Sequence, residues 1–238
     1  MGSNIRAGLI LSVYSVLAIS ANAATVQLEG DTVTYEYDNV TNAAALTLFG
    51  MPTIVGDTVR FAPPNFKAQS IDGIGINTGT NTDSIGGNFI FDRVFSNNGL
   101  PIAEIKVTEF GDYEIVNGDS VSLDLLVSAS NNNNFAEFTS AQSSLDVSGD
   151  TGGLVVFTVN DVVATIFPAQ SFATNPNDIL ITIQNTLTAV TNAQDENAFI
   201  QKKLSFVATV VPIPASVWLL GSALGLLGVL RRRTTFAS

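Results

Sequence analysis

The sequence predicts an all-β protein, built as an antiparallel β-sandwich or a jelly roll. Three observations predict this fold class. Short runs of β-branched and aromatic residues alternate with polar residues along most of the chain. Clusters of Asn, Asp and Gly separate these runs, and helical periodicity is almost absent between them. The chain has 238 residues, no internal linker and no fixed-period repeat, so we expect one domain with a substantial core.

About ten short strands are expected, and seven of them alternate most clearly. The strand at 32–37 places Tyr35 and Tyr37 on one face, and the strand at 87–94 does the same for Phe89, Phe91 and, just beyond its end, Phe95. The other five strands are predicted at 102–110, 121–125, 155–159, 179–183 and 204–211. Turns are predicted at 117–119, 131–134, 148–153 and 175–178. Weak helical patterns at 136–141 and 192–199 are the helix candidates inside this part.

The first 23 residues predict a secretory signal peptide. Arg6 gives a positive start, residues 7–20 form a short apolar core, and Ala21 and Ala23 form a small-x-small cleavage site. We therefore expect export through the Sec machinery and cleavage after Ala23. A retained signal anchor is the alternative, and the short core and the cleavage site favour removal.

The opposite end combines a proline motif, an apolar stretch and a basic cluster. The motif consists of Val211, Pro212, Ile213, Pro214 and Ala215, and the cluster of Arg231, Arg232 and Arg233. Residues 216–230 between them carry no charge, and as a helix they would span about 22 Å of a hydrocarbon core of about 30 Å. The arginines are expected to stay cytoplasmic, with Trp218 near the other interface. The prolines prevent the helix from extending upstream and leave an accessible segment for a protease.

Together with the signal peptide, this tail resembles the PEP-CTERM family of exported proteins of Gram-negative bacteria, in its variant with a Val-Pro-x-Pro-Ala box. The resemblance implies that a membrane protease, exosortase, removes the tail and that the mature protein is released or re-anchored at the cell surface. It also implies a biofilm or exopolysaccharide setting. The box lacks the glutamate that names the family, which points to a different exosortase subtype. Residues 234–238 continue past the arginines, where many members of the family stop sooner. A single-pass tail anchor without processing is the alternative.

The chain is therefore expected to have three parts: a signal peptide at 1–23, an extracellular β-sandwich domain at 24–209, and a C-terminal sorting signal at 210–238. The middle part contains all 21 acidic residues and six of the ten basic ones, so its net charge is −15. Such a surface repels nucleic acid and anionic lipid, and we expect no nucleic-acid partner. Cysteine is absent, so no disulfide stabilises the exported domain.

The absence of histidine excludes a Ser-His-Asp triad and most zinc sites, and the absence of cysteine excludes thiol nucleophiles. A pair of carboxylates for glycoside hydrolysis remains, with Glu104 and Glu109, or Glu109 and Glu114, as nominees. Nothing in the sequence singles these residues out. The only tryptophan, Trp218, lies in the tail, so the domain lacks the usual aromatic platform of a sugar-cleaving cleft. We expect no catalytic residues and no enzyme activity, and a carboxylate-based hydrolase is the least favoured function.

Glycan binding without catalysis is the stronger alternative to a purely structural or adhesive role. Tyr35 and Tyr37 would form a small stacking platform if they were exposed. The competing interpretation, which the sequence favours, is that both rings pack on the sheet with their hydroxyls at its rim. The fourteen phenylalanines between Phe49 and Phe206 are predicted to form the core.

Calcium is the only cofactor that the sequence suggests. Asp146 and Asp150 flank a glycine-bent loop that offers hard oxygen ligands. The loop lacks the EF-hand spacing and its terminal glutamate. A turn that uses Asp and Gly for their backbone geometry explains the segment equally well, so the expectation is that no cofactor is required.

Overall fold

The computed structural model describes residues 24–166, 172–174, 176–211 and 222. The predicted signal peptide lies outside these residues, as do the sorting motif from Pro212 to Ala215 and the three arginines. No helix among the described residues is long and apolar enough to cross a bilayer.

Thirteen strands and one helix are found among the described residues. In chain order they are β1 (Thr25–Glu29), β2 (Val33–Asp38), α1 (Ala43–Phe49), β3 (Thr53–Val55), β4 (Thr58–Phe61), β5 (Lys67–Ile71), β6 (Ile74–Gly75), β7 (Thr82–Ser96), β8 (Glu104–Val116), β9 (Ser120–Asn131), β10 (Asn134–Ser148), β11 (Val155–Thr165), β12 (Asp178–Val190) and β13 (Asn197–Val210). Each of the seven predicted strands overlaps an observed strand. The predicted turns at 117–119, 131–134, 148–153 and 175–178 fall between consecutive long strands.

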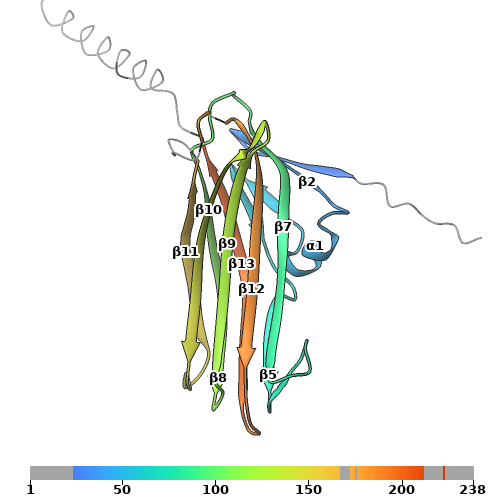
Figure 1. Cartoon of the computed structure of the whole chain (residues 1–238), viewed down its shortest axis with the longest axis vertical. Coiled ribbons are helices and arrows are strands. Elements are labelled where there is room, and N and C mark those ends of the chain that lie inside the picture. The colour runs from blue at the N-terminus through green and yellow to red at the C-terminus, as the bar shows by residue number, and fades with distance from the viewer. Residues whose placement is uncertain (1–23, 167–171, 175, 212–221, 223–238) are drawn as a thin grey trace, which may run out of the picture.

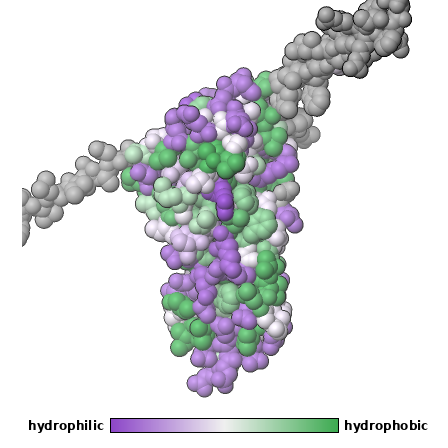
Figure 2. Space-filling model, turned by 180° about the vertical axis from the view of Figure 1, so that it is seen from behind, coloured by the Kyte–Doolittle hydropathy of each residue, from purple (hydrophilic) through white to green (hydrophobic). Residues whose placement is uncertain are grey.

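The strands form two antiparallel sheets that pack face to face, as Figure 1 shows. The six-stranded sheet has the order β1-β2-β7-β12-β9-β10, and the seven-stranded sheet has the order β11-β8-β13-β4-β3 with β5 and β6 attached to β13. The predicted all-β sandwich is therefore confirmed. On the side turned away from the viewer of Figure 1, polar and apolar side chains are interspersed over the surface (Figure 2).

The core lies between the sheets and follows the two-residue period of the long strands. On β9, for example, Val121, Leu123 and Leu125 are buried, whereas Asp124 between them is exposed. The half of the core nearest α1 is built from aromatic rings in mutual contact. Phe89 lies 4.8 Å from Phe61 and 5.0 Å from Phe91, centroid to centroid. Tilted and edge-on ring pairs of this kind stabilise a core beyond the area that they bury.

The helix α1 is held by Asn42, a side chain that no sequence pattern singled out. Buried Asn42 precedes the helix, and its amide donates to the carbonyl of Ile90 (2.9 Å) while its Oδ1 accepts from the Ile90 amide (2.8 Å). The side chain thus extends the hydrogen bonding of β7 and places Phe49 in the core. The two helix candidates are wrong, because residues 136–141 belong to β10, and residues 192–199 form a turn and the start of β13.

A β-bulge corrects the predicted face of Phe95. Val94 pairs with Ile179 and Phe91 with Ile181, so β7 contains one extra residue at this point. The extra residue turns Val94 into the core and Phe95 outward, where the Arg93 guanidinium lies 4.3 Å from the ring centroid. Phe89 and Phe91, which precede the bulge, face the core as predicted.

The prediction that all the phenylalanines form the core is also wrong for Phe110, Phe199 and Phe206, which are only partly buried on the outward side of β8 and β13, and for Phe135 and Phe138. Phe135 and Phe138 are 68% and 51% exposed. Both lie near the tip of the β9–β10 hairpin, where the register shifts between Asn134 and Phe138. At the end of an edge strand no facing layer remains to cover these rings.

Candidate functional site

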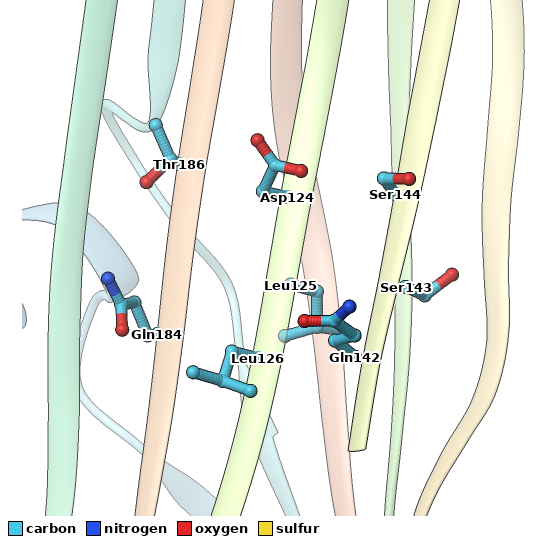
Figure 3. A pocket seen from close by; sticks show the side chains of 8 residues that line it. All are labelled: Asp124, Leu125, Leu126, Gln142, Ser143, Ser144, Gln184 and Thr186. Atoms are coloured by element: carbon cyan, nitrogen blue, oxygen red, sulfur yellow. The ribbon is translucent and has the colours of Figure 1, made fainter. Parts of the chain in front are cut away.

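The outer face of the six-stranded sheet carries a shallow groove with a volume of about 310 Å³. It runs over the middle of β12, β9 and β10, where outward side chains of the three strands meet (Figure 3). The lining residues are Asp124, Leu125, Leu126, Gln142, Ser143, Ser144, Gln184 and Thr186. Register places Thr186 opposite Asp124, and Asp124 opposite Ser144, so the three polar groups form a row across the sheet.

The chemistry of this groove is that of neutral hydrogen bonding. Amide groups of Gln142 and Gln184 and hydroxyls of Ser144 and Thr186 both donate and accept, and Asp124 adds acceptors. Leu126 supplies an apolar floor. Such a surface suits a neutral, hydroxyl-rich ligand.

A second cluster of polar groups lies inside the sandwich. Glu109 on β8 and Lys202 on β13 form an ion pair in which both side chains are 0% exposed, with Lys202 Nζ donating to Glu109 Oε1. Asn185 on β12, in the facing sheet, donates from Nδ2 to the same oxygen at 2.7 Å. Ser205 adds a longer hydrogen bond of 3.3 Å to that atom. One carboxylate oxygen therefore collects donors from both sheets.

The surroundings of this interior cluster are aromatic. Lys202 Nζ lies 4.6 Å from the ring centroid of Phe49 and 5.4 Å from that of Phe66. Burial lowers the pKa of the Lys202 ammonium below its ordinary value, and the nearby Glu109 carboxylate opposes that shift. Within the described residues, Glu109 Oε2 and Asn185 Oδ1 have no hydrogen-bond partner. Buried polar groups left in this way are rare in folded proteins.

Tyr35 and Tyr37 cannot form a glycan-stacking platform, because both are completely buried. They face into the sandwich from β2, with ring centroids 5.2 Å from Phe91 and 5.3 Å from Phe89, respectively. The Tyr35 hydroxyl donates to the carbonyl of Asp57 (2.7 Å) and accepts from the hydroxyl of Thr209 (2.8 Å), whereas that of Tyr37 has no partner in the described part of the chain. The competing interpretation, packing of both rings, is the one observed.

The Tyr35 hydroxyl is expected to make the stability of the fold sensitive to alkali. Burial raises the pKa of this hydroxyl well above its ordinary value, against an opposing contribution from the Thr209 hydrogen bond. The unfolded chain releases this proton above about pH 10, so stability is fully present below that pH and falls as the pH rises further.

Replacing Tyr35 with phenylalanine should therefore flatten the alkaline loss. At neutral pH it should cost about 1–3 kcal/mol, because the Asp57 carbonyl loses its donor and the Thr209 hydroxyl loses its acceptor. Urea unfolding at neutral and alkaline pH measures both effects. Tyr37→Phe is the matched control, with little cost at neutral pH because its hydroxyl donates to no described group. Equal costs for the two variants would contradict this account.

The proposed calcium ligands lie at the end of the β9–β10 ladder. Asp146 is an exposed residue of β10 opposite Ser122, and Asp150 Oδ1 accepts from the amide of Gly152 at 2.7 Å. The carboxylate of Asp150 thus holds the turn. Among the described residues, no group of three or more His, Cys, Asp or Glu side chains is placed to hold a metal ion.

The nominated carboxylate pairs do not converge. Glu109 faces the interior from β8, whereas Glu104 and Glu114 lie on the opposite face of the strand. Their spacing of five residues is odd, and side chains alternate between the faces of a strand. Glu104 forms an ion pair with Lys106 at 2.9 Å instead. Neither pair has the geometry of a hydrolytic site.

Sequence reasoning missed Asn185 and Lys202. Both interrupt an apolar series at an inward position: Ile181, Ile183, Asn185 and Leu187 on β12, and Ala198, Ile200 and Lys202 on β13. A polar residue at an inward position of an otherwise apolar strand face was the sequence feature that could have identified both. Of the predicted sorting motif only Val211 is described, and Pro212, Ile213, Pro214 and Ala215 lie outside the described residues, as do the cleavage residues Ala21 and Ala23 and the basic cluster Arg231, Arg232 and Arg233.

No protein-family model and no curated protein matches the sequence. Several solved structures show weak likeness, among them the following three. The structure of infectious bursal disease virus, Gx strain, matches with a TM-score of 0.31 and 11% identity over 68% of this chain and 33% of that one. A proposed glycoside hydrolase from Bacteroides thetaiotaomicron matches with a TM-score of 0.26 and 9% identity over 80% and 57%. The N-terminal cellulose-binding domain of Cellulomonas fimi β-1,4-glucanase C matches with a TM-score of 0.20 and 15% identity over 64% and 93%.

The chain spans one third of the first of these proteins and just over half of the second. At such TM-scores the likenesses assign neither a fold family nor a function. The fold and the groove themselves define the class: an antiparallel β-sandwich protein with a polar depression on one outer face and a charged cluster in its core.

Proposed function

We propose that this chain is an exported, non-enzymatic structural or adhesive protein of the cell surface or extracellular matrix, routed by a signal peptide and a C-terminal sorting signal. The observation that carries the proposal is where the sandwich starts and stops. β1 begins at Thr25, directly after the predicted cleavage site, and β13 ends at Val210, directly before the Pro212–Ala215 segment. Both routing segments can therefore be removed without taking a strand from either sheet.

The test is the mass of the exported protein in a Gram-negative host that carries a matching exosortase. The mature form is expected to lack residues 1–23 and the segment that contains Trp218. Changing Pro212 and Pro214 together to alanine is expected to leave the tail in place, since the apolar helix can then extend over the cleavage segment. An exported protein that still contains Trp218, or a chain of full translated mass in the cytosol, would contradict the proposal.

A second function, glycan binding, is supported by the groove over β9, β10 and β12. Its amides and hydroxyls match the alternating donors and acceptors of a polysaccharide, and its low charge suits a neutral one. The exported protein should then be retained on the exopolysaccharide of its own host. The matrix role above does not depend on this interaction.

Gln142 and Gln184 are the variants of choice for this second function, because both are exposed and their loss does not disturb the core. Changing both to alanine is expected to weaken retention by about fivefold to a hundredfold, since each hydrogen bond contributes about 0.5–1.5 kcal/mol. Gln194→Ala is the control, an exposed glutamine in the β12–β13 turn outside the groove. Unchanged retention of the double variant would rule out the groove as the binding surface.

A further inference from the structure

The interior cluster holds three groups that are rarely buried together: an amine, a primary carboxamide and a carboxyl group. Lys202 Nζ and Asn185 Nδ2 both donate to Glu109 Oε1, the latter at 2.7 Å. All three side chains are buried at or below 1% exposure. An ion pair alone explains Lys202 and Glu109, but it does not explain why a carboxamide from the facing sheet meets the same oxygen.

We propose that Lys202 and Asn185 form an intramolecular isopeptide bond, with Glu109 as the proton-transferring group. In this reaction Nζ replaces Nδ2 on Cγ of Asn185. The nitrogen that arrives and the nitrogen that leaves both contact one carboxyl group, as a shuttle between them requires. The fold supplies the proximity, because the three strands hold the groups together once the sheets have packed.

The interior favours the reactive forms of the groups. Transfer of a proton from Lys202 to Glu109 converts two buried charges into a neutral amine and a neutral acid, which an apolar environment prefers. The rings of Phe49 and Phe66 lie 4.6 Å and 5.4 Å from Nζ and keep water from it. A desolvated lysine is an effective nucleophile toward carbonyl carbon.

The atoms balance without a cofactor. The lone pair of Nζ attacks Cγ, and the protonated Glu109 donates to Oδ1 as charge develops there. A half-turn of the amide brings Oδ1, which has no partner among the described residues, to Glu109 and exchanges the hydrogen bond of Nδ2 for one to Oδ1. The Cγ–Nδ2 bond then breaks and ammonia leaves. Of the three protons of the Lys202 ammonium, one stays on the new amide, one leaves in ammonia and one remains on Glu109.

The bond would join the two sheets covalently, since β12 lies in the six-stranded sheet and β13 in the seven-stranded one. The chain contains no cysteine that could provide such a link. The adjacent Lys203 is 53% exposed and pairs with Asp112 on the other side of β8, so it has no access to Asn185.

Peptide mass spectrometry of the full chain tests the proposal. Digestion of the denatured protein after acidic residues cuts at Asp195 and Glu196, between the two partners. The expected product is a pair of peptides, one with Asn185 and one with Lys202, that stay linked and are together lighter by one ammonia molecule. Two separate peptides at their calculated masses from folded protein would overturn the proposal and leave an ion pair only.

Variants separate the roles of the three residues. Lys202→Arg keeps a positive charge beside Glu109 and should abolish the linked pair, and Glu109→Gln should abolish it or slow its formation at least tenfold. Lys203→Arg is the matched control and should leave the linked pair intact. A linked pair that persists in Lys202→Arg would overturn the assignment. If a variant fails to fold, the presence or absence of the linked peptides in the unmodified chain decides the question by itself.

Discussion

Replacing Lys202 with methionine is expected to lower the free energy of unfolding by about 3–5 kcal/mol. The change leaves the carboxylate of Glu109 without its ion-pair partner in a site where both side chains are fully buried. Replacing Glu109 with leucine in the same chain should regain much of the loss, because the uncompensated charge disappears with it. Urea unfolding of the two variants, followed by circular dichroism, measures both effects.

The control is Lys106→Met, which breaks a partly exposed ion pair with Glu104 and should cost less than about 1 kcal/mol. The proposed bond to Asn185 is absent from both Lys202 variants, so the part of the loss that the double variant does not regain contains the contribution of that bond together with the cost of leaving the Asn185 amide without its acceptor. A double variant that is less stable than Lys202→Met alone would show that the Glu109 charge is not the cause.

Phe89→Ala is expected to have an effect of similar size, about 3–5 kcal/mol. The ring lies in the middle of the aromatic layer, with centroids of Phe61, Phe91, Tyr37 and Phe49 all within 6.0 Å. Its removal opens a cavity between two sheets that are held by many other contacts and cannot close over it. Thermal and urea unfolding of the exported protein are the measurements.

Phe138→Ala is the matched control, since the same ring in β10 is half exposed. Its cost should stay within about 0.5 kcal/mol. Comparable losses for the two variants would mean that the layer around Phe89 is loosely packed and that hydrophobic area alone sets the stability.

The strands were predictable because the alternation of apolar and polar residues that marks a strand is a local feature of the sequence. Alternation on β9 and β12 puts apolar residues at every second position, and the turns between strands use Asn, Asp and Gly for their backbone geometry. The seven-residue helix α1 was missed because it is too short for a helical period to emerge. It depends on the contact of Asn42 with Ile90, 48 positions further along the chain.

The interior cluster could not be predicted, because its members meet only after the sheets assemble. Glu109 is separated from Asn185 by 76 positions and from Lys202 by 93. A register shift between Lys202 and Leu204 also decides the geometry, since it lets Lys202 and Ser205 both face inward on β13. A single extra residue of the same kind turned Phe95 to the surface. Bulges depend on the partner strand, and an alternation rule applied to one strand does not detect them.

Apart from the Asp124 carboxylate, the polar side chains of the groove over β9, β10 and β12 carry no charge, and this has an environmental consequence. Hydroxyl and carboxamide groups do not ionise at any pH a bacterium survives, and dissolved salt screens only charges. Contacts made through Gln142, Gln184 and Thr186 will therefore keep nearly the same strength in fresh water and in brine. If the proposed glycan binding uses this groove, retention on the polysaccharide should therefore change little with salt concentration.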